Sequence, residues 1–356
     1  MQFNKTLGIL GSGQLAKMMA EAANKLGIST IVYSSDVEPC SAESVKKVIT
    51  ASFLHEERLF QFANECDFIT IETENIPLWT LEFLEKNFPG KIRTSSSFVG
   101  IAQNRLKEKQ FAKENGIPTG KNWQVGNKEE IAQIVAENGA CILKTATQGY
   151  DGKGQVVINS IKDIPELNPN FKYILEQKIP FFCEISVIAT RNAKGTVFFP
   201  IPRNIHKEGI LRESIVPFAL ESFDKKQCKI IQTSALENTR KIAEKINHFG
   251  TFAVEYFVLE DGEILFNEMA PRPHNSGHFA NDLCNISQFE NHVRAVCDLP
   301  IISPKLLHNG KMFNIIGNDI HELEKILDKP NHKIHLYNKI GVFHGRKLGH
   351  YNIIEK

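Results

Sequence analysis

Short apolar runs alternate with amphipathic stretches along the first hundred residues. Strand-like runs are TLGIL (6–10), ISTIVYS (28–34) and DFITIE (67–72), and helix-like stretches are QLAKMMAEAANKLG (14–27), ERLFQFANEC (57–66) and LWTLEFLEKNF (78–88). Strands that alternate with helices in this way predict βαβ units and a parallel, doubly wound sheet. We therefore expect a Rossmann-like domain at the start of the chain.

The loop GSGQLA, Gly11 to Ala16, lies at the first strand-to-helix turn of this domain. Backbone N–H groups and the helix dipole favour an anion at such a turn. Asp36 follows the second strand, near the place where a dinucleotide-binding fold has its ribose-binding acid. A nicotinamide-dependent dehydrogenase is therefore one hypothesis, although a tight turn that only packs a helix on a sheet has the same pattern.

A helix-like stretch and a linker lead out of the first domain, and a second unit begins after them. The Lys- and Glu-rich stretch 104–116 predicts a helix that ends at Gly116, and IPTG (117–120) is expected to be a linker. The next stretch has Asn127 as a candidate N-cap and Gly139 as a candidate C-cap, followed by a strand over 140–146.

The loop KTATQGYDGKGQ, residues 144–155, is rich in glycine but lacks the P-loop spacing. It connects two strand-like runs, whereas a P-loop runs from a strand into a helix. Such a hairpin predicts a lid whose N–H groups close over a nucleotide, and an ordinary exposed hairpin is the alternative.

The segment TFAVEYFVLEDGEILFNEMAPR, residues 251–272, has alternating apolar runs on either side of Asp261 and Gly262. Asp-Gly between such runs predicts a two-residue turn, and that register places Glu255 directly opposite Glu268. Two carboxylates with β-carbons about 4.5–5.5 Å apart destabilise a sheet, so the pair predicts a Mg²⁺ site completed by phosphate oxygens and water. A bulge that shifts the register, or a shared proton, is the alternative. An apolar floor on the same face is expected from Phe257, Leu259, Ile264 and Phe266.

The next stretch, NEMAPRPHNSGH (267–278), gathers polar side chains between Pro271, Pro273 and a glycine. The prolines oppose a helix and hold the chain extended, which predicts a rigid turn with projecting functional groups. The polar side chains of this turn are Arg272, His274, Asn275 and His278.

Composition narrows the class of protein. The 356 residues include 42 Lys and Arg and 41 Asp and Glu, so no overall field attracts nucleic acid or an anionic membrane. Seven scattered cysteines without a C-x-x-C pair indicate reduced, mostly buried thiols. No run approaches the roughly 20 apolar residues of a membrane span, and glycine comes too early for a signal peptide, so the cytoplasm is the expected compartment. At about 150 residues per domain, the length indicates two or three domains.

Several motifs together resemble one family. They are ETEN (72–75), the triplet Gln103 to Arg105, GYDGKGQ (149–155), NEMAPRPHNSGH (267–278), SQFENHVRAV (287–296) and GRKLGHYN (345–352). In this order they resemble the N5-carboxyaminoimidazole ribonucleotide synthases, a family of ATP-grasp ligases in purine biosynthesis. The resemblance runs from about Leu7 to about Asn352.

The resemblance implies a mixed α/β ATP-grasp fold with three domains. These are a Rossmann-like domain over 1–103, an ATP-grasp domain over 104–300 with a lid at about 118–180, and a small β-rich domain over 301–356. It also implies carboxylation of 5-aminoimidazole ribonucleotide with bicarbonate, ATP and Mg²⁺, for which Mn²⁺ can substitute. A carboxyphosphate intermediate, ADP and phosphate as products, and a homodimer follow from the same resemblance.

The resemblance assigns individual residues as well. ATP is expected at Arg105, Lys144, Gly149, Tyr150, Asp151, Gly152, Lys153, Gly154, Gln155, Glu176, Gln177, Lys178, Ile179, Glu184, His206, Asn267 and Glu268, with the metal at Glu255 and Glu268. The ribonucleotide is expected at Gly13, Gln14 and Glu74, with its 5′-phosphate at Lys339, Arg346 and Lys347. The residues implied in the chemistry are Glu74, Tyr150, Asp151, Lys153, Arg272 and His274, of which Asp151 and His274 are the candidates to accept the amine proton.

Other functions share part of this pattern. A formate-dependent glycinamide ribonucleotide transformylase or a biotin carboxylase would share the metal hairpin but would not explain NEMAPRPHNSGH followed by SQFENHVRAV. A dehydrogenase would explain the first glycine loop but not the opposed glutamates or the lid. An inactive nucleotide-binding module is hard to reconcile with so many charged residues in motifs.

Overall fold

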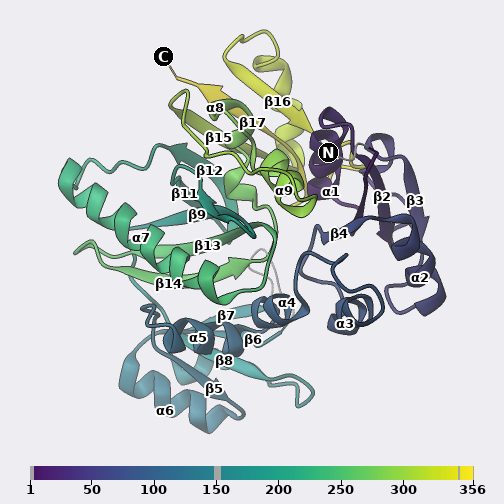
Figure 1. The fold of residues 1–356 in the computed structure, drawn as a ribbon. Helices are drawn as coiled ribbons and strands as arrows, with labels where there is room; N and C mark the ends of the chain where they lie inside the picture. The colour runs from purple at the N-terminus through teal and green to yellow at the C-terminus, as the bar shows by residue number, and fades with distance from the viewer. Residues whose placement is uncertain (1–3, 148–153, 344, 356) are drawn as a thin grey trace.

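The computed structural model describes residues 4–147, 154–343 and 345–355, which form three sheets with helices around them (Figure 1). The N-terminal sheet has the strand order β3-β2-β1-β4, and all its pairs are parallel. Its strands are β1 (Thr6–Leu10), β2 (Ser29–Ser34), β3 (Lys47–Thr50) and β4 (Phe68–Ile71). Its helices are α1 (Gln14–Lys25), α2 (Glu56–Glu65) and α3 (Leu78–Asn87). The predicted Rossmann-like βαβ arrangement is confirmed.

Both faces of this parallel sheet are covered, as its apolar strands require. Helices α2 and α3 pack on one face. On the other face α1 packs together with α9 (Gln288–Val296), which comes from much later in the chain and contributes Phe289 and Val293 to the shared core. The N-terminal domain is therefore joined to the rest of the protein by a continuous apolar core.

A small antiparallel sheet, lower in Figure 1, has the order β5-β8-β6-β7. Its strands are β5 (Asn122–Val125), β6 (Cys141–Thr145), β7 (Gln155–Ile158) and β8 (Tyr173–Gln177), and α6 (Lys128–Asn138) packs on it. Asn127 accepts a hydrogen bond from the Glu130 N–H, and Gly139 ends α6 with φ +79°, so both predicted caps are confirmed. The predicted hairpin of 144–155 is confirmed because β6 and β7 pair with Lys144 opposite Gln155.

Two helices lead into this sheet. They are α4 (Ser96–Ala102) and α5 (Arg105–Glu114). Asn104 caps α5 by accepting from the Leu106 and Lys107 N–H groups, and Gly116 takes the left-handed conformation just beyond its end, as predicted.

The largest sheet has the order β14-β13-β9-β11-β12-β15-β17-β16, with β10 paired to β9. Its strands are β9 (Cys183–Asn192), β10 (Gly195–Phe198), β11 (Arg203–Lys207), β12 (Ile210–Val216), β13 (Gly250–Val258), β14 (Ile264–Ala270), β15 (Gly310–Ile316), β16 (His332–Leu336) and β17 (Lys347–Ile354). Helix α7 (Lys225–Lys245) covers one face, while α8 (Ala280–Leu283) and α9 lie toward the other. The C-terminal strands therefore extend the central sheet through the β12–β15 pair. All seven cysteines are free thiols, and all except Cys40 are buried.

The turn between β13 and β14 differs from the prediction. Val258 pairs with Ile264, the Glu263 carbonyl accepts from the Leu259 N–H at 2.8 Å, and Gly262 has φ +86°. Residues 260–262 thus form a three-residue loop, in which glycine supplies the left-handed position. The predicted two-residue turn over Asp261 and Gly262 is wrong.

The register within this hairpin shifts again at Glu255. Val254 pairs with Met269 but Tyr256 pairs with Phe266, so Glu255 stands opposite both Asn267 and Glu268 at a β-bulge. The predicted direct opposition of Glu255 and Glu268 is therefore wrong, and the bulge is the correct alternative.

The longer turn also corrects the predicted apolar floor, because it shifts the pairing of β13 with β14 by one residue. Ile264 and Phe266 are paired with Val258 and Tyr256 and pack in the core with α7. Phe257 stays on the other face and stacks on Phe181 with ring centroids 4.6 Å apart.

His292 of α9 links the N-terminal sheet to the central sheet. The Thr251 N–H of β13 donates to its Nδ1 at 3.0 Å, which leaves Nε2 to donate to the Thr70 hydroxyl of β4 at 2.9 Å. Burial, followed by the neighbouring His248, lowers the pKa of His292 to about 3. The ring is therefore held neutral at the junction of two domains.

We predict that acid destabilises the protein through His292. The pKa of His292 in the folded state lies below the ordinary value of about 6.5. Below pH 6.5 the ring therefore binds a proton in the unfolded chain but not in the folded protein. The contribution of His292 to the free energy of unfolding is fully present above about pH 6.5. At pH 5 it should be lower by about 2 kcal/mol. Urea unfolding at pH 7.5 and pH 5 measures the loss.

His292→Asn should show a smaller loss of unfolding free energy between the two pH values than the wild type. His308→Asn, at an exposed position, is the matched control and should keep the wild-type pH dependence. An equal loss in all three proteins would contradict the role of His292.

Candidate functional site

A cleft of about 1060 Å³ lies between the small sheet, the central sheet and the N-terminal domain. The small sheet and the central sheet contribute lining residues, and the N-terminal domain contributes the start of α1 and the loop after β4. The charged residues on its wall include Glu72, Glu74, Lys144, Glu184, Glu255 and Arg272.

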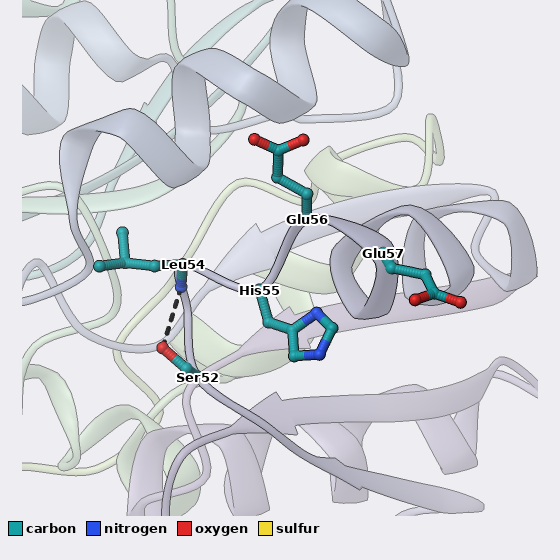
Figure 2. Close-up of a pocket in the computed structure, with 5 residues that line it drawn as sticks. All are labelled: Ser52, Leu54, His55, Glu56 and Glu57. Atoms are coloured by element: carbon teal, nitrogen blue, oxygen red, sulfur yellow. Dashed lines mark hydrogen bonds between the residues drawn. The ribbon is translucent and has the colours of Figure 1, made fainter.

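A second depression of about 480 Å³ lies where the chain enters α2 (Figure 2). It is lined by Ser52, Leu54, His55, Glu56 and Glu57, which come from one short segment and are all exposed. The hydrogen bond drawn there joins the Leu54 N–H to the Ser52 hydroxyl at 3.2 Å. This depression gathers no groups from distant elements, so the larger cleft is the candidate site.

The first glycine loop is occupied by a carboxylate of the chain itself. Glu72, just after β4, accepts from the Gly13 N–H at 3.0 Å and from the Ala16 N–H at 3.4 Å. A Cβ at Gly13 would lie 2.9 Å from a Glu72 oxygen, which explains the glycine there. Because Glu72 already occupies the N-terminus of α1, the pyrophosphate of a dinucleotide has no place at this turn. Asp36 instead accepts from the Ser12 hydroxyl at 2.6 Å.

Glu74 and Arg272 form an ion pair across the cleft. Arg272, in the loop after β14, donates from Nη2 to Glu74 Oε1 at 2.8 Å and from Nε to the other oxygen. Burial would raise the pKa of Glu74, but the guanidinium of Arg272 lowers it below its ordinary value. The pair fixes the loop of the central sheet against the N-terminal domain.

Glu176 of β8 lies between two lysines. Lys144 Nζ of β6 is 2.6 Å from one carboxylate oxygen, and Lys109 Nζ of α5 is 3.4 Å from the other. Burial opposes the charge, but Lys109 and then Lys144 lower the pKa of Glu176 to about 2. Lys109 also donates to the Asn267 carbonyl at 2.6 Å and so connects the small sheet to the central hairpin.

Glu108 holds the bulge of β14. Its carboxylate accepts from the Met269 N–H at 2.6 Å and is buried. Burial raises the pKa of Glu108 to about 8, with Lys109 opposing the rise and Glu268 adding to it. The sequence reasoning missed Glu108 and Lys109, although their spacing from Arg105 places all three on one face of α5.

Glu255 is buried on β13, whereas Glu268 is exposed on β14, and both line the cleft. Burial, and then the charge of the neighbouring Glu268, raise the pKa of Glu255 to about 8. This unfavourable placement of two carboxylates fits a divalent cation. The described residues include no group of three or more His, Cys, Asp or Glu side chains arranged to hold a metal. Any cation here would therefore need further oxygen ligands from phosphate or water.

Two histidines lie near these carboxylates. His206 Nδ1 of β11 is 2.5 Å from Glu184 Oε2 of β9. Burial would lower the pKa of His206, but the hydrogen bond to Glu184 raises it above the ordinary value. His274 Nε2 lies 3.4 Å from Glu255 Oε1, and burial followed by Arg272 lowers the pKa of His274 well below its ordinary value.

The base of the glycine-rich hairpin is attached to α5. Arg105 donates its backbone N–H to the Ala146 carbonyl at 2.8 Å and its guanidinium to the Thr145 carbonyl at 3.1 Å. Gly154 has φ +77°, and Gln155 lines the cleft. The predicted site residues Gly149, Tyr150, Asp151, Gly152 and Lys153 lie outside the described residues.

Most of the other predicted residues do come together. The predicted residues that line the cleft are Gln14, Glu74, Arg105, Lys144, Gln155, Glu184, His206, Glu255, Asn267, Glu268, Arg272, His274 and Lys347. The cleft lining does not include Gly13, Gly154, Glu176, Gln177, Lys178, Ile179, Lys339 or Arg346. Among these, Gln177 and Lys178 use their N–H groups to bond the Lys121 and Ala140 carbonyls at 2.9 Å.

Lys339, Arg346 and Lys347 lie close enough to act on one another. Burial lowers the pKa of Lys339, Cys40 and Glu72 oppose that change, and Arg346 and Lys347 add to it. The three cations thus gather beside the first glycine loop, at the end of the cleft that Lys347 lines.

Three family models match successive parts of the chain. A ribonucleotide synthetase preATP-grasp domain matches residues 4–103, an ATP-grasp domain matches 110–289, and a phosphoribosylaminoimidazole carboxylase C-terminal domain matches 311–356. The matched ranges follow one another without overlap along almost the whole chain.

Known proteins are similar over the full length. The N5-carboxyaminoimidazole ribonucleotide synthase of Brucella melitensis is 38% identical over 97% of this chain and 95% of its own, and that of Bacillus subtilis is 37% identical over 98% and 91%. A solved ADP complex of an N5-carboxyaminoimidazole ribonucleotide synthetase superposes with a TM-score of 0.92 at 38% identity, covering 100% of this chain and 93% of that one. The Aspergillus clavatus synthase in complex with ADP and 5-aminoimidazole ribonucleotide superposes with a TM-score of 0.90 at 30% identity, covering 100% and 95%.

We predict that Glu108→Ala destabilises the bulge of β14. The Met269 N–H would lose the acceptor that the Glu108 carboxylate provides, at a cost of about 1–3 kcal/mol in the free energy of unfolding. Glu108→Gln keeps a carbonyl oxygen for this bond and should cost less than half as much. Equal unfolding free energies for the two variants, measured in urea, would show that the bond does not hold the bulge.

Proposed function

The chain belongs to the family of N5-carboxyaminoimidazole ribonucleotide synthases, and on this basis we propose which residues of its cleft bind each substrate and which take part in the reaction. The enzyme is an ATP-dependent ligase of purine biosynthesis that carboxylates 5-aminoimidazole ribonucleotide to N5-carboxyaminoimidazole ribonucleotide. The hypotheses of a dehydrogenase, of a formate-dependent transformylase or biotin carboxylase and of an inactive module are therefore wrong for this chain.

ATP binds between the small sheet and the central sheet. The proposal places the adenine along Glu176 to Ile179, the ribose at Glu184 with His206 nearby, and the phosphates at Arg105, Lys144 and the hairpin 149–155. The observation that carries it is the set of cations and carboxylates that line this cleft from α5, β6 and β14, with Glu176 of β8 held behind them by Lys109 and Lys144. Fixed cations on rigid elements suit a phosphate chain because little reorganisation is needed when it binds.

Magnesium, or manganese in its place, is held by Glu255 and Glu268. The raised pKa of Glu255 beside Glu268 supports this proposal, since a cation would stabilise both charged forms. When bound, the metal would neutralise charge on the β- and γ-phosphates and orient them for transfer. Asn267 lies next to Glu268 on the same cleft wall and completes the proposed nucleotide site.

The ribonucleotide binds where the N-terminal domain meets the central sheet. Lys339, Arg346 and Lys347 hold its 5′-phosphate, while the loop at Gly13 and Gln14 lies along it. Glu74 approaches the ring amine, and Arg272 and His274 flank the reacting carbon. Tyr150, Asp151 and Lys153 reach the substrate from the hairpin. The ion pair of Glu74 with Arg272 supports this arrangement, because it brings the amine site and the carboxyl site together.

The reaction has two steps in this proposal. A bicarbonate oxygen attacks the γ-phosphorus of ATP, and the bond to the β-phosphate oxygen breaks to give carboxyphosphate and ADP. The substrate amine then takes the carboxyl group, directly or as CO₂, while phosphate leaves and the amine loses a proton. Closure of the hairpin excludes water, which would otherwise hydrolyse carboxyphosphate.

The remaining assignments rest on the family. We propose domains at 1–103, 104–300 and 301–356 with the lid at about 118–180, a homodimer, and a cytoplasmic location. The ranges matched by the three family models support the division. Within the described ranges, no helix has the length and apolar character needed to cross a bilayer.

The proposed reaction predicts ADP formation that depends on the ribonucleotide. Purified protein with ATP, Mg²⁺ and bicarbonate should release ADP at a rate that rises at least about 10-fold when 5-aminoimidazole ribonucleotide is added, because the full site forms only with both substrates. A coupled ADP assay measures both rates. ADP release that responds instead to another acceptor would overturn the substrate assignment and leave the ATP site intact.

The metal assignment predicts that Glu268→Ala loses ADP formation. Loss of a metal ligand should cost more than the 10–100-fold typical of outer-shell changes, so a decrease beyond about 100-fold is expected. The fold should persist, because the change removes a negative charge beside Glu255. Glu263→Ala, an exposed glutamate of the same hairpin, is the control and should keep its activity. Activity retained in Glu268→Ala would refute the metal site.

A further inference from the structure

His274 is oriented by a chain of buried polar groups behind the cleft. Its Nδ1 lies 3.3 Å from the Ser276 backbone N and 2.8 Å from the Ser276 hydroxyl, while its Nε2 lies 3.4 Å from Glu255 Oε1. A backbone N–H can only donate, so Nδ1 must accept and the neutral ring carries its proton on Nε2. The opposite tautomer would direct two hydrogens at each other.

The Ser276 hydroxyl is itself constrained from behind. It lies 2.7 Å from the Ser186 hydroxyl of β9, which receives a hydrogen bond from the Asn204 amide of β11 at 3.0 Å. The Asn204 oxygen in turn accepts from Ser214 of β12 at 2.8 Å. Because Nδ1 of His274 accepts, the Ser276 hydroxyl donates to it. The hydroxyl–hydroxyl bond must then have Ser186 as the donor and the Ser276 oxygen as the acceptor.

Every donor in this chain therefore points the same way, from β12 toward the cleft. Ser186, Ser214 and Ser276 have no exposed surface and Asn204 is 4% exposed, so solvent cannot supply alternative partners. Ser186 is also the strand neighbour of Glu255 in the β9–β13 pair. The chain thus passes the strand neighbour of Glu255 at Ser186 and ends at His274, beside the proposed metal ligand.

We infer that Ser276, supported by Ser186 and Asn204, is a positioning residue that locks His274 as an Nε2–H donor toward the reacting groups. The Nε2–H of His274 then faces Glu255 Oε1, 3.4 Å away, in the free enzyme, and donates a hydrogen bond to the bicarbonate-derived carboxylate during reaction. It does not take the proton from the substrate amine. The inference rests on the proposed role of His274 beside the reacting carbon.

Gln288 supports the same geometry from the other side of the loop. Its amide oxygen accepts from the His274 backbone N–H at 2.9 Å, and its amide nitrogen donates to the His274 carbonyl at 2.7 Å. A Cβ at Gly277 would lie 2.6 Å from this oxygen, so the glycine leaves room for the bond. Backbone and ring of His274 are thus fixed independently.

The tautomer is measurable without turnover. In protein labelled with ¹⁵N-histidine, long-range proton–nitrogen correlation distinguishes Nε2–H from Nδ1–H rings, and loss of one set of signals in His274→Gln assigns His274. We expect the Nε2–H pattern at pH 7.5. An Nδ1–H pattern in the wild type would overturn the inference even if the enzyme carboxylates its substrate. If instead the enzyme failed to carboxylate the substrate, only the proposed function would be refuted, and the Nε2–H pattern would still be expected.

Kinetics test whether Ser276 acts through His274. Ser276→Ala should lower kcat about 10-fold with KM for ATP within about 2-fold, because the nucleotide contacts are untouched. In a His274→Gln background, Ser276→Ala should lower kcat by less than about 2-fold, because the ring that Ser276 positions is absent. An equal decrease in kcat in both backgrounds would show that Ser276 has only a structural role.

Thr190→Val is the matched control, since it removes another buried hydroxyl of β9 that bonds only within the sheet, to Thr251 at 2.8 Å. It should keep kcat within about 2-fold of the wild type. If Ser276→Ala does not fold, Ser186→Ala removes the next hydroxyl along the chain and should lower kcat in the same direction. No decrease in that variant would overturn the inference.

Discussion

The cleft is organised around one constraint, which is that Glu255 must be held as a buried carboxylate beside a second one. Burial and the charge of Glu268 both raise its pKa, to about 8. Burying a carboxylate without a compensating partner is unfavourable. It persists at sites where the surrounding groups fix the side chain and a ligand supplies the partner. The bulge of β14, the hydrogen bond from Met269 to Glu108 and the nearby ring of His274 all fix this region.

The same constraint explains why the site needs the whole chain. The cations proposed for the phosphates come from α5 and the small sheet, the carboxylates proposed for the metal come from the central hairpin, and the partner of Arg272 comes from the N-terminal domain. Helix α9 joins these parts because one side packs on α1 while Gln288 and His292 bond to the loop after β14 and to β13. A change in the packing of α9 would therefore alter the distance between the two halves of the site.

Local sequence patterns predicted much of this structure. The period of the apolar residues predicts the parallel N-terminal sheet, and the caps at Asn127, Gly139 and Gly116 follow from local backbone chemistry. The turn after β13 was predicted one residue too short, because a three-residue loop with a left-handed glycine fits Asp261 and Gly262 as well as a two-residue turn does. The sequence leaves the bulge opposite Glu255 as an alternative and cannot decide for it, since the Met269 N–H there bonds to Glu108, about 160 positions away. The occupation of the first glycine loop by Glu72 likewise depends on contacts between distant segments.

Transfer of the carboxyl group from bicarbonate to the ribonucleotide tests the assigned reaction most directly. The enzyme is incubated with ATP, Mg²⁺, 5-aminoimidazole ribonucleotide and ¹³C-bicarbonate, and ¹³C NMR follows the carbonyl region together with ADP formation. A carbamate carbon bonded to the exocyclic nitrogen, formed in equal amount to ADP and absent without ATP, is the expected result. ADP formation with all the label remaining in bicarbonate would contradict the assignment.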